Sequence, residues 1–227
     1  RAHPLAQSGV GIAGDGFDYR IIDKVVSPRL GKHARYRSWD KWLDVPAHWF
    51  TNFARWNQLA VMKSPETIRE LEKLAASADD PEGIEKLIEM IEDDLGWPLY
   101  KAVSEAKAAL SSAEEARLAF HHGTIHIDAT VRRTDFESWI ADDLARIDEA
   151  IETAITISGV PPGEIDKVFL TGGTSFVPAV RRLFVSRFGE DRIETGEQLL
   201  SIAYGLALIG AEEDIERWTV RETVRAA

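Results

Sequence analysis

The stretch from residue 167 to residue 188 decides the fold, and it reads KVFLTGGTSFVPAVRRLFVSRF. Its apolar run Val168–Leu170 predicts a short buried strand, and the diglycine Gly172-Gly173 follows almost at once. Apolar residues then recur at helical spacing. Glycine lacks a Cβ, so a ligand can approach its backbone closely, and the free N–H groups of a helix start suit a phosphate or a polar ligand edge. The pattern indicates a nucleotide-binding corner, although a tight turn without a ligand has the same sequence.

Composition limits the classes of function. With 227 residues and 44% hydrophobic content, the chain can bury a substantial core, as one domain or as two unequal lobes. Its net charge of −11 argues against general affinity for nucleic acid or an anionic membrane, both of which favour positive surfaces. Cysteine is absent and no apolar run has membrane length, so we expect a cytoplasmic protein. Because the chain opens at Arg1 rather than at a methionine, we expect part of a longer protein.

The first sixty residues combine a helix, a basic loop and an aromatic cluster. The first dozen residues predict loop or strand, a helical pattern begins after Phe17-Asp18, and residues 27–38 predict a loop. Large aromatic side chains then crowd together at mostly helical spacing. We interpret them as a packed helical core or the filling of a subdomain groove, rather than as a ligand cage. The cluster consists of Trp39, Trp42, Trp49, Phe50, Phe53 and Trp56.

The middle of the chain is predicted to be helical. Ser64-Pro65 and Asp80-Pro81 each place a capping side chain before a proline, which is typical of a helix start. The second of these helices is expected to stop at Gly96, and a third to span residues 98–110. Alternation of apolar and polar residues then predicts a β-hairpin over residues 116–132.

The C-terminal half predicts an open α/β layer. Thr134–Glu137 forms a capping box, which is expected to open a long helix that ends at Gly159. A turn at residues 161–163 leads to the diglycine strand, and a last helix carries apolar residues. The fold class is therefore α/β with a mixed α+β middle. The apolar residues of the last helix are Leu199, Ile202, Leu206 and Ile209.

The residues alone indicate no catalytic or metal site. The sequence has neither a serine in a nucleophile elbow nor a Walker-type phosphate loop. His121, His122 and His126 lack an identifiable fourth ligand, so we expect surface histidines on the hairpin instead of a metal centre. The carboxylates between residues 89 and 94 are interpreted as the solvated face of an amphipathic helix.

Separated segments together resemble the nucleotide-binding domain of the DnaK-type, seventy-kilodalton heat-shock chaperones, in the actin-like ATPase superfamily. Ile12–Asp18 (IAGDGFD) resembles that family's Leu-Gly-Gly-Glu-Asp-Phe-Asp turn, and Glu105–Ser112 (EAKAALSS) resembles its adenosine-site helix. Val168–Pro178 resembles the diglycine signature, and Ser201–Ala207 the helix that closes the domain. The tryptophan-rich insert looks closest to an atypical, YegD-like branch.

The resemblance implies the second lobe of that ribonuclease H-like fold. A largely helical subdomain IIB with the hairpin would span residues 13–137, and residues 1–12 and 138–227 would form part of subdomain IIA. ATP or ADP, with Mg²⁺ in the complete protein, would lie between this lobe and a missing first lobe. A nucleotide-exchange factor or co-chaperone would be a partner. The implied adenosine-side residues are Gly14, Lys107, Ser111, Gly172, Gly173, Thr174 and Phe176.

The chain departs from the family's pattern at the implied site. Ser104 stands where the family has a glutamate, Ala108 where a basic residue is frequent, and Phe176 where an arginine stacks on adenine. Phenylalanine can still stack on a base, but it lacks the charge and hydrogen bonds of a guanidinium group. The phosphate loops Asp-x-Gly-Thr and Asp-x-Gly-Gly-Gly-Thr are both absent from the sequence. Because of the substitutions at the implied site, we expect weak nucleotide binding at best. Because phosphoryl transfer needs such loops, we expect no ATP hydrolysis by this chain alone.

Two alternatives remain open. One is a protein-interaction module with a degenerate nucleotide site, in which the tryptophan cluster of residues 39–56 contacts a partner. The other is the C-terminal domain of a sugar- or acetate-kinase-type protein of the same superfamily, which the tryptophan-rich insert makes less favourable. The role of the tail after Ala211 is not indicated by any pattern.

Overall fold

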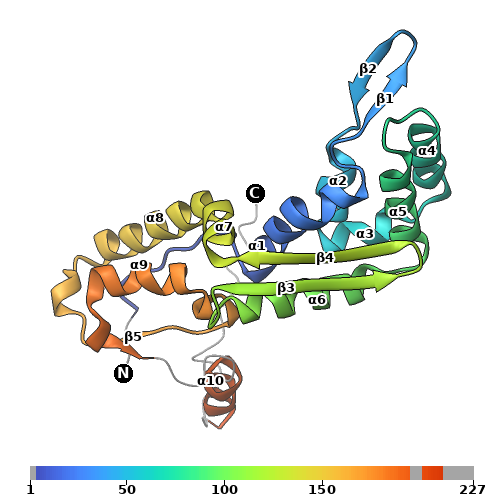
Figure 1. The fold of residues 1–227 in the computed structure, drawn as a ribbon. Helices are drawn as coiled ribbons and strands as arrows, with labels where there is room; N and C mark the ends of the chain where they lie inside the picture. The colour runs from blue at the N-terminus through green and yellow to red at the C-terminus, as the bar shows by residue number, and fades with distance from the viewer. Residues whose placement is uncertain (1–3, 195–200, 212–227) are drawn as a thin grey trace, which may run out of the picture. The chain divides into compact units, whose positions relative to one another are not determined.

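The computed structural model describes residues 4–194 and 201–211, and it divides the chain into two compact units, Arg1–Gly159 and Val160–Ala227. In the described residues, the first unit contains two antiparallel hairpins and the helices up to α8. The second unit contains a parallel pair of short strands with α9 and α10 (Figure 1). A mixed α/β class is thus confirmed, while the subdomain edges at residues 13 and 137 stay predictions. No helix among the described residues has the length and apolarity that a membrane span needs.

The first helix supplies the centre of the first unit. Helix α1 (Gly14–Ile21) continues as a π-helical segment, Ile22–Val26, and a 3₁₀ turn, Ser27–Leu30. Phe17, Ile21 and Ile22 are fully buried, as their spacing predicts. The helix begins before Phe17, at Gly14. The basic segment 27–38 is not the predicted loop, since it contains the 3₁₀ turn and strand β1 (Arg35–Ser38).

Two capped helices and a third helix follow the predicted order. Helix α4 is Pro65–Ala75, α5 is Pro81–Glu92 and α6 is Gly96–Ala109. The Ser64 Oγ accepts a hydrogen bond from the Thr67 N–H at 3.1 Å, and the Asp80 Oδ1 accepts one from the Gly83 N–H at 3.1 Å, so both predicted caps are confirmed.

The predicted stop at Gly96 is wrong. Helix α5 already ends at Glu92, where Asp94 adopts the left-handed φ of 54° that a terminating glycine usually supplies. The Leu95 N–H then donates to the Met90 carbonyl at 3.1 Å and closes the turn. Gly96 is left free to begin α6.

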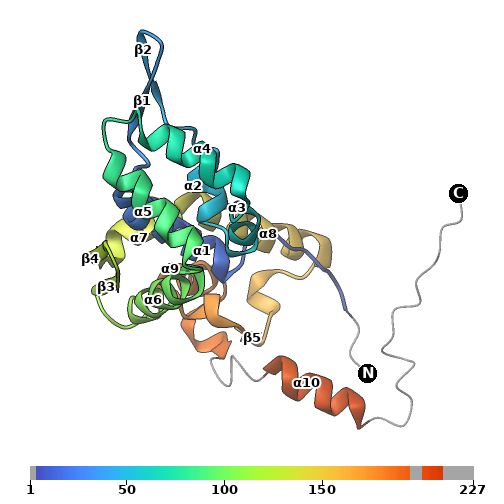
Figure 2. The same cartoon turned by 90° about the vertical axis from the view of Figure 1, so that its right-hand side faces the viewer.

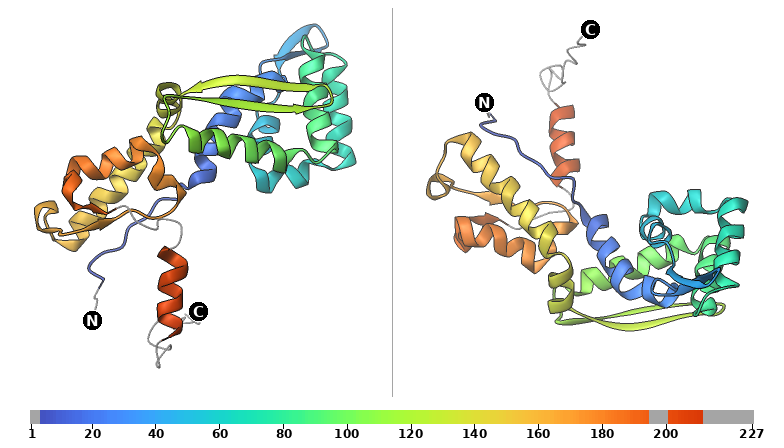
Figure 3. Two further views of the ribbon diagram at one scale, coloured as in Figure 1. Left: turned by 60° about the horizontal axis from the view of Figure 1, so that its bottom comes forward. Right: turned by 90° about the horizontal axis from the view of Figure 1, so that it is seen from above.

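The β3–β4 hairpin covers α6. Strand β3 (Glu115–His122) pairs antiparallel with β4 (Ile125–Arg132), which confirms the predicted hairpin. Alternate residues of β3 are buried, and the strand packs along α6, as two views agree (Figures 1 and 3). These buried residues are Ala116, Leu118 and Phe120.

The aromatic cluster is divided between a hairpin and two helices. Trp39 and Trp42 belong to the hairpin of β1 and β2 (Lys41–Asp44), where they are 94% and 49% exposed, so the predicted helical core is wrong for them. Figure 2 shows this hairpin projecting from the end of the unit that holds α4. Trp49, Phe50 and Phe53 are buried in α2 (His48–Phe53), as predicted. Helix α3 (Trp56–Met62) follows, and the side chain of Trp56 lies outside what the structure describes.

The long helix predicted after Thr134 is two helices, α7 (Arg133–Trp139) and α8 (Ala141–Ser158). The predicted capping box is not formed, because α7 begins at Arg133 and has no side-chain cap. A tertiary bond fixes this start instead, since the Arg133 N–H donates to the Glu114 carbonyl at 2.8 Å. The end at Gly159, with a left-handed φ of 67°, is confirmed.

The second unit is built around β5 (Val168–Phe169), which pairs in parallel with β6 (Ile193–Glu194). The strand is shorter and less buried than predicted, because Phe169 is 72% exposed and only Leu170, beyond the strand, is buried. The other elements are 3₁₀ turns at Pro162–Glu164, Gly173–Phe176 and Glu190–Arg192, and helices α9 (Pro178–Phe188) and α10 (Ser201–Gly210). Of the predicted last helix, Leu199 lies outside the described residues.

Candidate functional site

Helix α6 brings Lys107 to the start of α1. The Lys107 ammonium donates to the Gly14 carbonyl at 2.9 Å and pairs with the Asp18 Oδ1 at 2.8 Å. The two charged side chains are only 15% and 14% exposed. Two of the predicted site residues, 93 positions apart in the sequence, therefore meet in the first unit.

Asp18 was not among the predicted site residues, yet it holds Lys107 in place. Burial raises the pKa of the Asp18 carboxyl, and the hydrogen bond from Lys107 acts against that rise. The Lys107 ammonium therefore offsets part of the cost of burying the Asp18 carboxylate. A sequence signal did exist, because Asp18 lies one helical turn after Gly14 and so shares its face of the helix.

Tyr100 lies on the same side of α6. Burial raises the pKa of its phenol, and the negative charge of Asp18 adds to that rise. The Tyr100 hydroxyl is therefore neutral at physiological pH, and it donates to the Phe53 carbonyl at 3.0 Å. This bond links α6 to the end of α2.

A cavity of about 500 Å³ opens beside the N-terminal part of α1. Arginines line it together with the backbone of the preceding loop. One of them, Arg20, is held by Asp143 through two bonds, Nε to Oδ2 at 2.9 Å and Nη2 to Oδ1 at 3.2 Å. The other two arginines, Arg55 and Arg146, offer donors that suit a polar or anionic ligand, while Asp15 and Asp143 place carboxylates in the same lining. The lining residues are Gly11, Ile12, Ala13, Asp15, Gly16, Tyr19, Arg20, Ala54, Arg55, Tyr100, Asp143 and Arg146.

A second cavity, of about 700 Å³, shares Asp15 and Tyr100 with the first. Its lining is more apolar and includes Leu59, Ile91 and Trp97. Ser104, the residue that departs from the family's glutamate, also borders it. Neither cavity was predicted, because their lining residues come from distant segments and form no motif.

Ser111 lies in the turn directly after α6, where it is half-buried. Its backbone N–H donates to the Ala108 carbonyl at 3.0 Å. The turn holds Ser111 one helical turn beyond Lys107, as the sequence predicts.

In the second unit the diglycine backbone is open. Gly172 has a φ of 82°, a conformation that favours glycine, and a Cβ built on Gly172 or Gly173 would meet no atom within 4 Å. The buried Ser175 fixes the turn, because its Oγ donates to the Gly172 carbonyl at 2.6 Å. Thr174 is half-buried and the Phe176 ring is 43% exposed.

The helix after the diglycine begins later than predicted. A 3₁₀ turn occupies residues 173–176, and α9 starts only at Pro178. The free N–H groups of α9 are thus displaced from the glycines, because Val177 takes an extended conformation before the proline.

The predicted site residues fall into two groups. Gly14, Lys107 and Ser111 belong to the first unit, and residues 172–176 to the second. The nucleoside clamp that would unite the two groups stays a prediction. The three hairpin histidines are exposed, as predicted, with the rings of His121 and His126 5.4 Å apart across the strands.

Comparison with known proteins gives two related findings. A family model described as "Hsp70 protein" matches residues 84–215, which include Lys107, Ser111 and the diglycine. Chaperone protein DnaK of Deinococcus proteolyticus is 30% identical over 118 residues, 48% of this chain and 19% of that protein. Chaperone protein DnaK of Deinococcus radiodurans is 29% identical over 118 residues, with the same two shares, and chaperone protein dnaK of Cyanidium caldarium is 28% identical over 119 residues, 50% of this chain and 19% of that protein. The match thus spans about a fifth of each relative's length, and the YegD-like branch stays a prediction.

Proposed function

Because this chain belongs to the Hsp70 family, we propose that it is the second lobe of a chaperone-like ATPase and supplies the adenosine side of an ATP/ADP cleft. The contact between Lys107 and Gly14 carries this proposal. It joins the start of α1 to the adenosine-site helix implied by the resemblance, so that both motifs border one region. The neighbouring cavity with its arginines supports it.

Each residue has a distinct role in the proposed site. A lysine ammonium has three N–H donors, and the Gly14 carbonyl and Asp18 account for two of them. The third can bond a ribose or adenine acceptor, with the Ser111 hydroxyl one helical turn away. Asp18 is a positioning residue, since it acts on the nucleotide only through Lys107.

The second unit would contact the nucleotide through its backbone. The open space at Gly172 and Gly173 allows a nucleoside to rest on bare peptide groups. The exposed Phe176 ring would stack on the base in place of the family's arginine. Stacking without a guanidinium group predicts reduced affinity for adenine.

The phosphate groups of the nucleotide would be bound outside this chain. In the proposed complete protein, a first lobe supplies the phosphate loops and Mg²⁺, and a nucleotide-exchange factor or co-chaperone acts on this lobe. The proposed compartment is the cytosol, which the cysteine-free composition favours.

Titration of the ¹⁵N-labelled chain with ADP tests the proposal. We expect millimolar binding, with amide shifts concentrated at Gly14, Ser111 and Gly172–Thr174. Ser111→Ala should weaken binding, whereas Ser112→Ala, a neighbouring exposed serine, should not. Shifts confined to other residues, or no shifts at all, would contradict an adenosine site.

The exposed hairpin favours a second candidate function, a protein-interaction module. Trp39 and Trp42 present large apolar surfaces to solvent, which is costly without a partner, whereas Trp49 is buried in α2. Under this hypothesis Trp42→Ala abolishes capture of partners but leaves the thermal unfolding midpoint unchanged. Trp49→Ala is the contrasting variant, and it should lower that midpoint. Equal partner capture by the wild type and Trp42→Ala would exclude the hairpin as an interface.

A further inference from the structure

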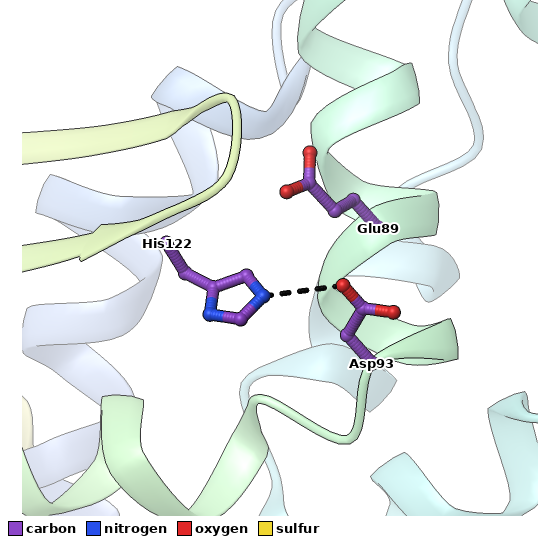
Figure 4. A group of neighbouring side chains, drawn as sticks. All are labelled: Glu89, Asp93 and His122. Carbon is purple, nitrogen blue, oxygen red and sulfur yellow. Dashed lines mark hydrogen bonds and ion pairs between the residues drawn. The ribbon is translucent and has the colours of Figure 1, made fainter.

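A mixed nitrogen and oxygen donor set lies where α5 meets the β3–β4 turn. Glu89 and Asp93 are one helical turn apart at the end of α5, and His122 reaches toward them from the end of β3 (Figure 4). One ligand atom from each side chain lies within 4.8 Å of the other two. The His122 Nε2 is 3.2 Å from the Asp93 Oδ2.

The hairpin turn orients Glu89 from the other side. The Thr124 N–H donates to the Glu89 Oε1 at 3.1 Å, and the Thr124 hydroxyl donates to Oε2. Gly123 makes room for this approach, since a Cβ there would stand 2.0 Å from Oε1. Such outer bonds are typical of metal-binding carboxylates, whose remaining lone pairs stay available to an ion.

In the part of the chain that the structure describes, neither carboxylate is paired with a lysine or an arginine, and only His122 contacts Asp93 as an ion-pair candidate. The nearby lysines are paired elsewhere, Lys86 with Glu82 and Lys63 with Asp94. Two carboxylates this close repel each other, and a bound cation would relieve that repulsion.

We propose that Glu89, Asp93 and His122 bind a divalent transition metal of the zinc class. An imidazole nitrogen with carboxylate oxygens is a donor set that Zn²⁺ accepts, whereas Mg²⁺ and Ca²⁺ prefer oxygen alone. Water completes the coordination, since the site is open to solvent. The ion would tie the end of α5 to the hairpin that covers α6, and so stabilise the first unit.

Another pair of histidines offers an internal competitor. His121 and His126 face each other across the same hairpin, and a cross-strand pair of imidazoles can also hold Zn²⁺. They lie outside the Glu89 cluster. Variants of the two sets therefore distinguish the proposed site from adventitious binding to exposed imidazoles.

Calorimetric titration of the full chain with ZnCl₂, in a buffer that does not bind metal, tests the proposal. We expect one ion per chain and a higher thermal unfolding midpoint with zinc. His122→Ala and Asp93→Asn should each weaken binding by at least about tenfold and abolish the shift in the midpoint. The double variant His121→Ala/His126→Ala should retain both effects.

Three results would overturn the site. They are an absence of zinc binding by the wild type, undiminished binding by His122→Ala, and loss of binding in the His121→Ala/His126→Ala variant. Circular dichroism verifies that each variant is folded, which their exposed positions lead us to expect. Equal affinity for MgCl₂ would mean a nonspecific acidic surface and would also overturn the proposal.

Discussion

At the scale of single residues, the Lys107–Asp18 pair combines a structural and a proposed binding role. Both side chains are mostly buried, so each charge depends on the other for compensation. By contrast, Lys24 and Asp23 form a looser pair at 3.7 Å, with the lysine about half exposed. Asp23 also pairs with Lys32 at 2.6 Å, so loss of Lys24 leaves that carboxylate compensated and serves as a control.

We expect Lys107→Met to lower the free energy of unfolding by about 2–3 kcal/mol, because it leaves a carboxylate without a cation in a poorly solvated position. This is below the about 3–5 kcal/mol of full burial, since some solvent reaches the pair. The double variant Lys107→Met/Asp18→Asn should recover part of the loss. Urea unfolding followed by circular dichroism measures both.

Lys24→Met is the control, and its effect should stay within about 0.5 kcal/mol. If Lys107→Met lowered the free energy of unfolding by no more than Lys24→Met does, the Lys107–Asp18 pair would not contribute to stability.

At the scale of elements, a glycine contact joins the turn after the 3₁₀ segment to α5. A Cβ built on Gly83 would stand 2.6 Å from the Gly31 nitrogen and 2.8 Å from its Cα. A Cβ built on Gly31, whose φ is 83°, would stand 2.9 Å from the Ile84 Cγ1. The Gly31 atoms next to Gly83 are backbone atoms and cannot move aside as a side chain can, and the Asp80 Oδ2 also lies 2.5 Å from the Cβ position of Gly83.

Two effects oppose each other in Gly83→Ala. Alanine favours a helix by about 0.5–1 kcal/mol over glycine. Overpacking against backbone costs about 1–3 kcal/mol, so we expect net destabilisation and a lower thermal unfolding midpoint. Gly9→Ala, where no atom lies within 4 Å, should leave the midpoint unchanged. A midpoint raised by Gly83→Ala would mean that the contact relaxes.

How far the sequence predicts these elements depends on whether the cause is local. The caps at Ser64 and Asp80 are correct because the bonding atoms are three residues apart. The start of α7 is missed because its partner, Glu114, comes from before the hairpin. The exposure of Trp39 is missed for a related reason, since aromatic spacing alone cannot distinguish a hairpin from a helix.

The site follows the same rule. Lys107 and Gly14 were paired only through the family resemblance, since no periodicity relates residues 93 positions apart. The arginines of the cavity come from separate segments of the chain and carry no shared motif. A site formed by residues from distant segments could therefore be predicted from the sequence only where a known family already links those segments.

At the scale of the whole molecule, the family relationship extends across both units. The matched residues 84–215 begin within α5 and continue past α10. Both halves of the proposed adenosine site, apart from Gly14, fall inside this range. The chain as a whole carries neither phosphate loop of the family.

We therefore expect no release of phosphate from ATP above background by this chain, because positioned phosphate donors, a metal ion and an oriented water are all required for phosphoryl transfer. A colorimetric phosphate assay measures it, with an ATPase of known activity as the positive control. Sustained turnover that disappears in Lys107→Met would contradict this expectation.

The free edge of β2 has a consequence for solubility. Among the described residues this strand pairs with β1 alone, and all four of its side chains are exposed. A bare row of peptide groups next to exposed tryptophans could recruit a strand from another copy of the chain. Strand β2 is short and carries opposite charges at its ends, Lys41 and Asp44, and both features disfavour pairing with a strand of another copy. The hairpin can therefore expose aromatic side chains without promoting aggregation.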